Sequence, residues 1–206
     1  MEIVIAGAGI GGLTLALMLH QRGIGCRVYE SAQALRPLGV GINLLPHAVN
    51  ELDQLGLLQA LSQLGVATSA LHYYNKFGQP IWREPRGLHA GYPLPQFSIH
   101  RGEFQMLLAQ TVRDRLGESA IVTGMALESA GQENGRAYAC LRDRASGTLH
   151  TVSGDVVVGA DGIHSALRRQ LHPVGDALRY SGRMLWRAVT RAKPYLDGQT
   201  MFMAGH

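Results

Sequence analysis

The sequence predicts an α/β protein built on a parallel β-sheet, with a second, smaller part that is rich in β-strands. The first observation is an apolar strand over 2–6 that passes through a glycine-rich turn into a helix ending near residue 22. The second is a continuous apolar run over 155–159, as expected for a parallel strand buried on both faces. The third is a series of short strand-like segments over 120–153, which predicts a small antiparallel meander.

The elements of the first hundred residues follow from their turn signals. Gly23 and Gly25 end the first helix, and the strand after them favours a parallel pair joined by a right-handed crossover. Pro46 suits the first turn of a helix that Gly56 closes. The expected elements after the first helix are a strand over 26–30, a loop over 31–45, helices over 46–55 and 57–64, and a hairpin with strands over 70–74 and 79–83.

The second half is expected to resume the α/β pattern. Phe104 and Val112 lie on one face of an amphipathic pattern that predicts a helix over 101–116. A turn at 131–135 separates two of the meander strands. The expected elements after the helix are strands over 120–123, 125–130, 136–142 and 148–153, the buried strand over 155–159, a helix over 164–171, and strands over 184–192 and 199–204.

The composition indicates a globular protein that suits an anionic ligand. Of the 206 residues, 46% are hydrophobic and 17% charged, which excludes general disorder. The formal net charge is +4, but the arginines are scattered, so nucleic-acid binding is not expected. The charge-free run over 3–19 is not expected to span a membrane, because glycines interrupt it and Glu2 precedes it.

Cysteine and histidine usage predicts no metal centre. Cys26 and Cys140 are the only cysteines and are expected to be free thiols in a reducing compartment, the cytoplasm. The nine histidines lack the spacing of zinc ligands. His47, His164 and His172 are expected to be polar packing residues rather than catalytic bases, and no catalytic residue is assigned.

The glycine-rich turn has the spacing of a dinucleotide-binding motif. Gly7 permits a tight turn, Gly9 lets the backbone approach a pyrophosphate, and Gly12 lets the helix pack on the strand. Glu30 ends the next strand, where a carboxylate accepts hydrogen bonds from an adenosine ribose. This unit does not decide between NAD and FAD. Its candidate cofactor-binding residues are Gly7, Gly9, Ile10, Gly11, Gly12, Glu30 and Ser31.

A second motif begins at the buried strand. The residues over 155–168, DVVVGADGIHSALR, resemble the GADGxxSxxR motif of the FAD-dependent aromatic hydroxylases that share the para-hydroxybenzoate hydroxylase fold. The resemblance makes Asp161 a cofactor-binding candidate, since a strand-to-helix loop presents it. The alternative is an ordinary turn in which Asp161 or Ser165 caps the helix. Together with the first motif, this run points to the flavoprotein family.

Further cofactor contacts are implied by the resemblance. Arg101, which follows a strand and opens a helix, matches the family arginine that reaches FAD. The loop LRPLGVGIN resembles the segment that runs along the flavin ring, and it carries Arg36 and Val40. For Arg36 a solvated loop residue stays an equal alternative. Leu127 is a weaker candidate, against the adenine.

The resemblance extends over essentially all 206 residues. The segments WREPRG, YPLPQFSIHRGEFQMLL and MLWRAVT are similar to those of family members that hydroxylate phenazine carboxylates. Trp186-Arg187 fits the hydroxylase pattern, and the WxWxIP signature of flavin-dependent halogenases is not present.

The family implies a Rossmann-like FAD-binding domain with a small antiparallel β-meander, joined to a β-rich substrate domain. We expect the FAD-binding domain over 1–65 and 98–178, and partial substrate-domain strands over 66–97 and 179–206. The family's second half, with its GDAAH-like motif, has no counterpart here, so the chain is expected to be a truncated or incomplete form.

The implied activity is that of an FAD-dependent monooxygenase. In the intact enzyme NADH or NADPH reduces FAD, the reduced flavin captures molecular oxygen as a hydroperoxide, and a small aromatic or phenazine-like carboxylate is hydroxylated. The alternative is a catalytically incompetent remnant that binds FAD or only its ADP half. The substrate, the nicotinamide preference and the oligomeric state are not predicted.

Overall fold

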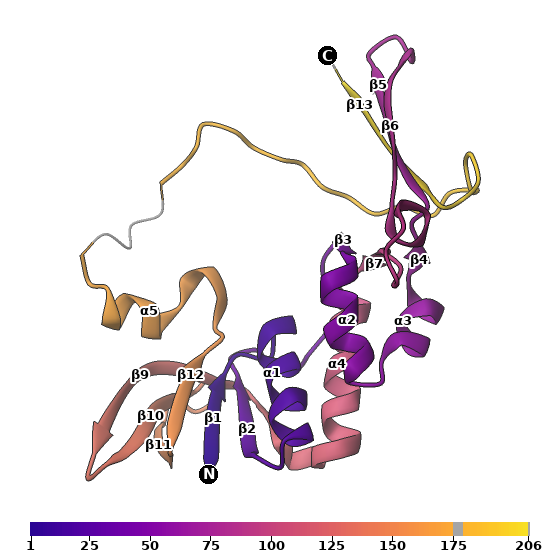
Figure 1. Ribbon diagram of the computed structural model, residues 1–206. Coiled ribbons are helices and arrows are strands. Elements are labelled where there is room, and N and C mark those ends of the chain that lie inside the picture. Colours follow the sequence, from indigo (N-terminus) through magenta and orange to yellow (C-terminus); the bar gives the residue numbers. More distant parts are fainter. Residues whose placement is uncertain (175–178, 206) are drawn as a thin grey trace. The chain divides into compact units, whose positions relative to one another are not determined.

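The computed structural model describes residues 1–174 and 179–205, and it divides into two compact units (Figure 1). Unit 1 comprises Met1–Pro37 and Gln105–Leu185, and unit 2 comprises Leu38–Phe104 and Trp186–His206. The expected segments 98–178 and 179–206 include residues 175–178 and His206, which lie outside the described residues.

Unit 1 is built on the parallel sheet that the sequence predicts. Its strands are β1 (Glu2–Ala6), β2 (Gly25–Glu30), β8 (Ile121–Thr123) and β12 (Val156–Gly159), in the order β12-β1-β2-β8. All three neighbouring pairs are parallel. The chain moves outward from β1 to β2 and β8, and it then returns to the other side of β1. The strand order therefore reverses between β1 and β12, which makes this the topological switch point of the sheet.

Each face of this sheet is covered by a different layer. The helix α1 (Ile10–Gln21) packs on β1 and β2 and buries Leu13 and Leu17. The meander of β9 (Met125–Glu133), β10 (Arg136–Asp143) and β11 (Leu149–Gly154) covers the opposite face. Here Val4 and Tyr29 form one buried cluster with Ala139 and Leu141. Successive side chains of a strand point to opposite faces, so β1 contributes to both layers.

The helices of unit 1 agree with the sequence except near the second motif. The helix α4 (Arg101–Leu116) has the expected bounds, and its first four residues belong to unit 2. The single helix expected over 164–171 is instead a 3-10 turn, η3 (Gly162–His164), and a short helix, α5 (Ala166–Leu171). The two are separated because Ser165 has the extended-type ψ of 123° and caps α5 with its side chain. A second short 3-10 turn, η2 (Glu118–Ala120), precedes β8.

Unit 2 combines two small sheets with two helices. The strands β3 (Gly41–Leu44), β7 (Phe97–His100) and β4 (Val66–Ala67) form an antiparallel sheet. The hairpin of β5 (Ala70–Asn75) and β6 (Pro80–Pro85) is confirmed, and β13 (Thr200–Gly205) pairs with β5 in parallel. The remaining elements are α2 (Pro46–Gln54), α3 (Leu58–Leu64) and the 3-10 turn η1 (Gly87–Ala90).

Three further expectations about single elements are wrong. The loop expected over 31–45 contains β3, which the glycines of this stretch concealed. The turn expected at 131–135 is shorter, because β9 continues to Glu133. The strand expected over 184–192 does not form, and Trp186 is 87% exposed. Apolar residues alone do not make a strand, since its N–H and C=O groups need a paired neighbour, and no described strand pairs with this stretch.

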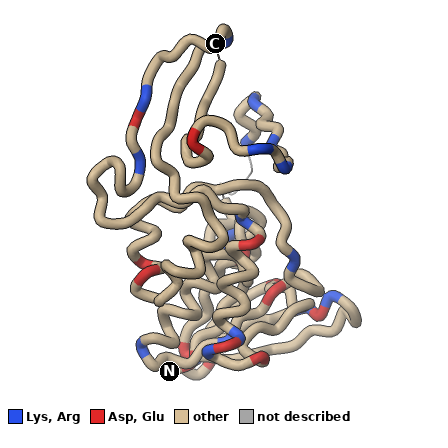
Figure 2. The backbone as a smooth tube through the Cα atoms, turned by 90° about the vertical axis from the view of Figure 1, so that its right-hand side faces the viewer, with Lys and Arg blue, Asp and Glu red and all other residues tan. Residues whose placement is uncertain are grey.

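Charged residues of both signs are spread along the described chain (Figure 2). Within residues 1–174 and 179–205, no helix combines the length and apolar character that crossing a bilayer requires. The same residues contain no group of three His, Cys, Asp or Glu side chains placed to hold a metal ion. Cys26 and Cys140 are free thiols, as predicted, and burial raises the pKa of the Cys26 thiol.

Candidate functional site

Two strand-to-helix turns of unit 1 meet at the switch point. One follows β1 and leads into α1, and the other follows β12 and leads into α5. The backbone N–H of Ala160 donates to the carbonyl oxygen of Ala6 at 2.7 Å. A Cβ atom on Gly7 would lie only 2.3 Å from the Ala160 carbonyl oxygen. The two motifs of the sequence, about 150 residues apart, are therefore in direct contact. Ligands of open α/β sheets bind in the crevice at such a point.

The four glycines of the first turn have two different environments. Gly7 has a φ of +108°, and a Cβ on Gly12 would lie 2.0 Å from the Gly7 carbonyl oxygen, so both positions are packed against protein. A Cβ on Gly9 or on Gly11 would meet nothing within 4 Å. Close packing of the fold explains only the first pair. Gly9 and Gly11 face open space at the start of α1.

The N-terminus of α1 is without a side-chain cap. Its N-cap residue is Gly9, no side chain accepts a hydrogen bond there, and the first turn contains no acidic residue. The first N–H groups of a helix have no partner inside the helix, and the helix dipole makes this end attractive to anions. The open glycines and these N–H groups together form a place for a phosphate group.

The turn is held in place from both sides through Ala8. The backbone N–H of Ala8 donates to Glu30 Oε2 at 2.8 Å, and its carbonyl oxygen accepts from Gln105 Nε2 at 2.8 Å. Glu30 Oε1 accepts from Ala32 N at 2.8 Å and from the Ser31 hydroxyl at 3.0 Å. The predicted site residues Glu30 and Ser31 are thus joined to the glycine turn. Gln105 was not among the predicted site residues, and the sequence indicates it only by its place on the helix one turn after Arg101.

The second turn places a carboxylate next to the first. Asp161 Oδ2 accepts from the Ala166 backbone N–H at 2.7 Å, and the Ser165 hydroxyl accepts from Arg168 N at 3.0 Å. Both residues cap α5, as the alternative interpretation of this motif predicted. The other oxygen, Asp161 Oδ1, is buried and has no hydrogen-bond partner among the described residues. A buried polar atom without a partner costs free energy unless something else supplies the bond.

Within the described part of the chain, the other predicted contact residues form no hydrogen bond with either of these two turns, and they are divided between the two units. In unit 2 the backbone N–H of Arg101 donates to the Val40 carbonyl oxygen at 3.0 Å. The Arg101 side chain is exposed and passes Gly39, where a Cβ would lie 3.7 Å from the Arg101 Cδ. In unit 1 Arg36 is exposed, and Leu127 is partly buried against the cluster of Val4 and Tyr29.

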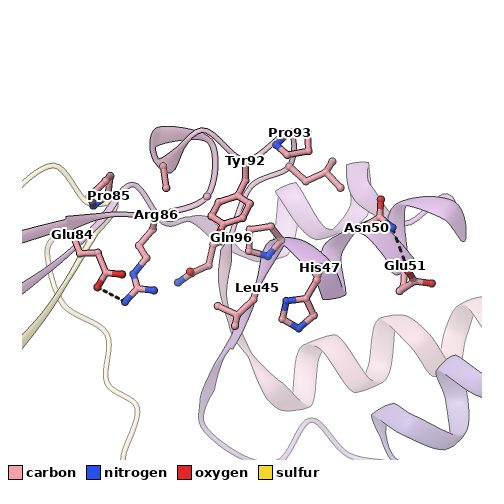
Figure 3. A pocket seen from close by; sticks show the side chains of 14 residues that line it. Leu45, His47, Asn50, Glu51, Glu84, Pro85, Arg86, Tyr92, Pro93 and Gln96 are labelled. Atoms are coloured by element: carbon pink, nitrogen blue, oxygen red, sulfur yellow. Dashed lines mark hydrogen bonds and ion pairs between the residues drawn. The ribbon is translucent and has the colours of Figure 1, made fainter.

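Unit 2 also contains a cavity of about 660 Å³ that the sequence did not indicate. Its walls come from the start of α2 and from the segment between β6 and β7. The side chains of Gln96 and Tyr92 lie between Arg86 and His47 (Figure 3). His47 is exposed at this cavity, and His164 and His172 are exposed as well, so the expectation that these three histidines are packing residues is wrong. Their side chains reach solvent because they lie at helix ends.

Several known proteins are similar to this chain. It is 47% identical over 205 residues to phenazine 1,6-dicarboxylic acid hydroxylase from Lysobacter antibioticus. This match covers 98% of this chain and 50% of the relative. It is 35% identical over 201 residues to 3-amino-4-hydroxybenzoate 2-monooxygenase from Streptomyces cremeus, covering 93% of this chain and 47% of the relative. The chain thus spans about half the length of the curated relatives it matches.

The fold is also that of a solved flavoprotein. The crystal structure of HpxO from Klebsiella pneumoniae, complexed with FAD and uric acid, matches with a TM-score of 0.67 and 26% identity, over 82% of this chain and 41% of that chain. These findings confirm the resemblance to FAD-dependent aromatic hydroxylases and the Rossmann-like fold. The family model described as "FAD binding domain" matches residues 1–189, and the chain belongs to this family of FAD-binding domains.

Proposed function

We propose that this chain is the FAD-binding part of a cytoplasmic monooxygenase that hydroxylates a small aromatic or phenazine-like carboxylate, using NADH or NADPH and molecular oxygen. One observation carries the proposal. At the switch point, the uncapped N-terminus of α1 lies against a turn that holds a carboxylate oxygen without a partner. The names of the relatives support the substrate class, because they describe hydroxylation of phenazine and benzoate acids.

The residues of unit 1 fit the ADP half of FAD. Gly9 and Gly11 leave room for the pyrophosphate at the N–H groups of Ile10 and its neighbours, while Gly7 and Gly12 hold the turn closed. Each carboxylate oxygen has two lone pairs. Glu30 Oε2 accepts one hydrogen bond within the described chain, so it can accept another from a ribose hydroxyl.

The roles of the remaining candidates follow the family resemblance. Asp161 Oδ1 would accept a hydrogen bond from the cofactor. The flavin side of the cofactor would contact Arg36, Arg101 and Val40. Leu127 would pack against the adenine. When bound, FAD supplies the electron transfer and the oxygen chemistry. The protein residues bind it, orient it and keep water from it. We also propose that residues 1–65 and 98–178 act as the FAD-binding domain, and that 66–97 and 179–206 contribute to the substrate domain.

Two variants of the second turn test the FAD site. Asp161 and Ser165 both cap α5, but only Asp161 has an oxygen without a partner. We expect Asp161→Asn to raise the Kd for FAD about tenfold, or about 1.4 kcal/mol, in titrations of flavin fluorescence. Ser165→Ala, the matched control, should leave the Kd unchanged. Equal Kd values for both variants and the unaltered chain would mean that Asp161 is only a helix cap.

Turnover separates the monooxygenase from the alternative, a piece that binds FAD or ADP without catalysis. The purified chain is mixed with FAD, NADH or NADPH, and phenazine-1,6-dicarboxylate. Nicotinamide oxidation that the phenazine stimulates, with a hydroxylated product in mass spectrometry, supports the full proposal. FAD binding without such stimulation supports the alternative for this chain. A chain that binds NAD but not FAD would contradict both.

A further inference from the structure

A residue that lines the cavity of unit 2, Arg86, has a donor that no described residue satisfies. Its Nη2 donates to Glu84 Oε2 at 2.9 Å. The Nε atom of the same guanidinium is buried and has no hydrogen-bond partner among the described residues. A guanidinium has five N–H donors and no acceptor. The bond that Arg86 Nε lacks can therefore come only from an acceptor, such as a carboxylate oxygen.

The backbone around Arg86 holds this donor in position. Its backbone N–H donates to the Ser69 carbonyl oxygen at 2.8 Å. The next residue, Gly87, is buried with a φ of +51°, and a Cβ there would lie 2.4 Å from the backbone nitrogen of Gln96. Only glycine fits this contact, so the chain on both sides of the cavity is tightly joined. A donor fixed in this way loses little conformational entropy when a ligand binds.

Part of the remaining wall favours a flat, apolar ligand body. Another part is lined by His47, Asn50 and Glu51. Tyr92, Pro93 and Leu45 line the same cavity and are close to its polar side chains (Figure 3). The volume of about 660 Å³ lies within the range of small-molecule sites, which are mostly apolar with a few fixed polar groups. Aromatic and proline rings present flat surfaces that suit a ring system.

We infer that this cavity binds the aromatic carboxylate, with Arg86 as the anchor of its carboxylate group. This inference rests on the proposed function, because the substrate class comes from there, and it adds the place and the anchoring residue. Glu84 competes with the ligand for the same guanidinium. The apolar walls hold the rings, and Gln96, whose side chain is buried in the cavity wall, limits how deep they reach.

The test measures binding without turnover. Equilibrium dialysis of the full chain, with and without FAD, gives Kd values for phenazine-1,6-dicarboxylate and for phenazine, which lacks the carboxylates. Arg86→Gln should weaken binding of the dicarboxylate about tenfold or more, as expected for loss of a hydrogen bond to a charged group. The affinity for phenazine should change less than about twofold, because no charge is involved.

Two further variants make the test independent of folding. Glu84→Gln releases Arg86 and should tighten dicarboxylate binding by roughly threefold, the scale of an exposed ion pair. A merely structural role of the Arg86–Glu84 pair would not give tighter binding. Arg83 is exposed in β6, the strand that also contains Glu84, and it does not line the cavity. Arg83→Gln removes the same charge as Arg86→Gln and should leave dicarboxylate binding unchanged.

The outcomes separate the two proposals. If Arg86→Gln and Arg83→Gln weaken binding equally, the effect is general electrostatics and the inference is overturned. It is also overturned if Glu84→Gln leaves dicarboxylate binding unchanged. If Arg86→Gln weakens dicarboxylate binding in dialysis without FAD, the inference is supported, even where the FAD titration has contradicted the proposed function. If the chain binds FAD but Arg86→Gln leaves dicarboxylate binding unchanged, the proposed function is supported and the inference is overturned.

Discussion

The turns after β1 and after β12 have the same topology and opposite chemistry. Both connect a parallel strand to a helix at the switch point of one sheet. The helix α5 has its first N–H groups bonded to Asp161 and Ser165. The helix α1 begins at Gly9 with no side-chain cap. In the first turn Gly9 and Gly11 leave space at the start of the helix, whereas in the second turn polar side chains cap the helix.

This difference shows which helix end is available to a ligand. A capped helix has used its N–H groups for its own stability. An uncapped helix retains them for a partner from outside, and the glycines keep side chains away from that partner. The capping bonds of the second turn contribute to stability, whereas the first turn is where we propose that the cofactor binds. Asp161 Oδ1 is a buried side-chain atom of the second turn without a hydrogen-bond partner among the described residues.

The largest effect is expected where α1 packs against the turn after β1. Gly12→Ala places a Cβ 2.0 Å from the Gly7 carbonyl oxygen, and the backbone has to move to accept it. We expect a loss of about 3 kcal/mol or more in the free energy of unfolding, measured by urea denaturation. A loss below about 1 kcal/mol would show that α1 packs less tightly on the turn after β1 than the structure indicates.

The next effect is on binding alone. Gly9→Ala adds the same methyl group three residues earlier, where a Cβ meets nothing within 4 Å and φ is −71°. The free energy of unfolding should change by less than about 1 kcal/mol. The Kd for FAD should rise about tenfold or more, because the methyl group occupies the space of the pyrophosphate. Unchanged FAD affinity would remove the distinction between packed and open glycines.

A smaller effect is expected at the cap of α5. Ser165→Ala removes the acceptor for Arg168 N, and the loss of such a cap costs about 1 kcal/mol of stability. Thermal unfolding followed by circular dichroism gives this change. The cap is local to α5, so FAD affinity should stay the same. A fall in FAD affinity as large as that of Gly9→Ala would assign binding to both turns.

The smallest effect is expected on the pH dependence of stability, from a turn of unit 2 that Asp197 caps. The backbone N–H groups of Gln199 and Thr200 and the hydroxyl of Ser69 donate to Asp197, and these bonds, that of Gln199 first, lower the pKa of Asp197 to about 2. A lowered pKa in the folded state contributes stability that is present above the ordinary value of 3.8 and is lost as the pH falls toward 2.

Carboxyl NMR titration should place the Asp197 midpoint near 2. Asp197→Asn should remove the pH dependence of stability between 3.8 and 2 that this residue contributes. A midpoint near the ordinary value would show that this turn, unlike the turn after β12, is not capped by its own carboxylate.

Much of unit 1 was predictable because its signals are local. The opening strand, the glycine turn and α1 follow from periodicity and glycine spacing, and the meander strands follow from alternation. The failures have a different cause, which is the pairing of segments that are distant in the sequence. Residues 184–192 have the pattern of a strand but no described strand to pair with, and β3 lies within a glycine-rich stretch. A strand exists only through its neighbours, which the sequence does not name.

The sequence by itself determined the motifs, the parallel sheet and the family, because glycine spacing and strand endings are written in neighbouring residues. It named Glu30 and Asp161 as site residues without showing what else they bind. Only the tertiary structure brought Ala160 against Gly7, joined Gln105 to Ala8, and left Arg86 Nε without a partner among the described residues. These facts depend on contacts between residues far apart in the chain, and such contacts arise only when the sheet order brings them together.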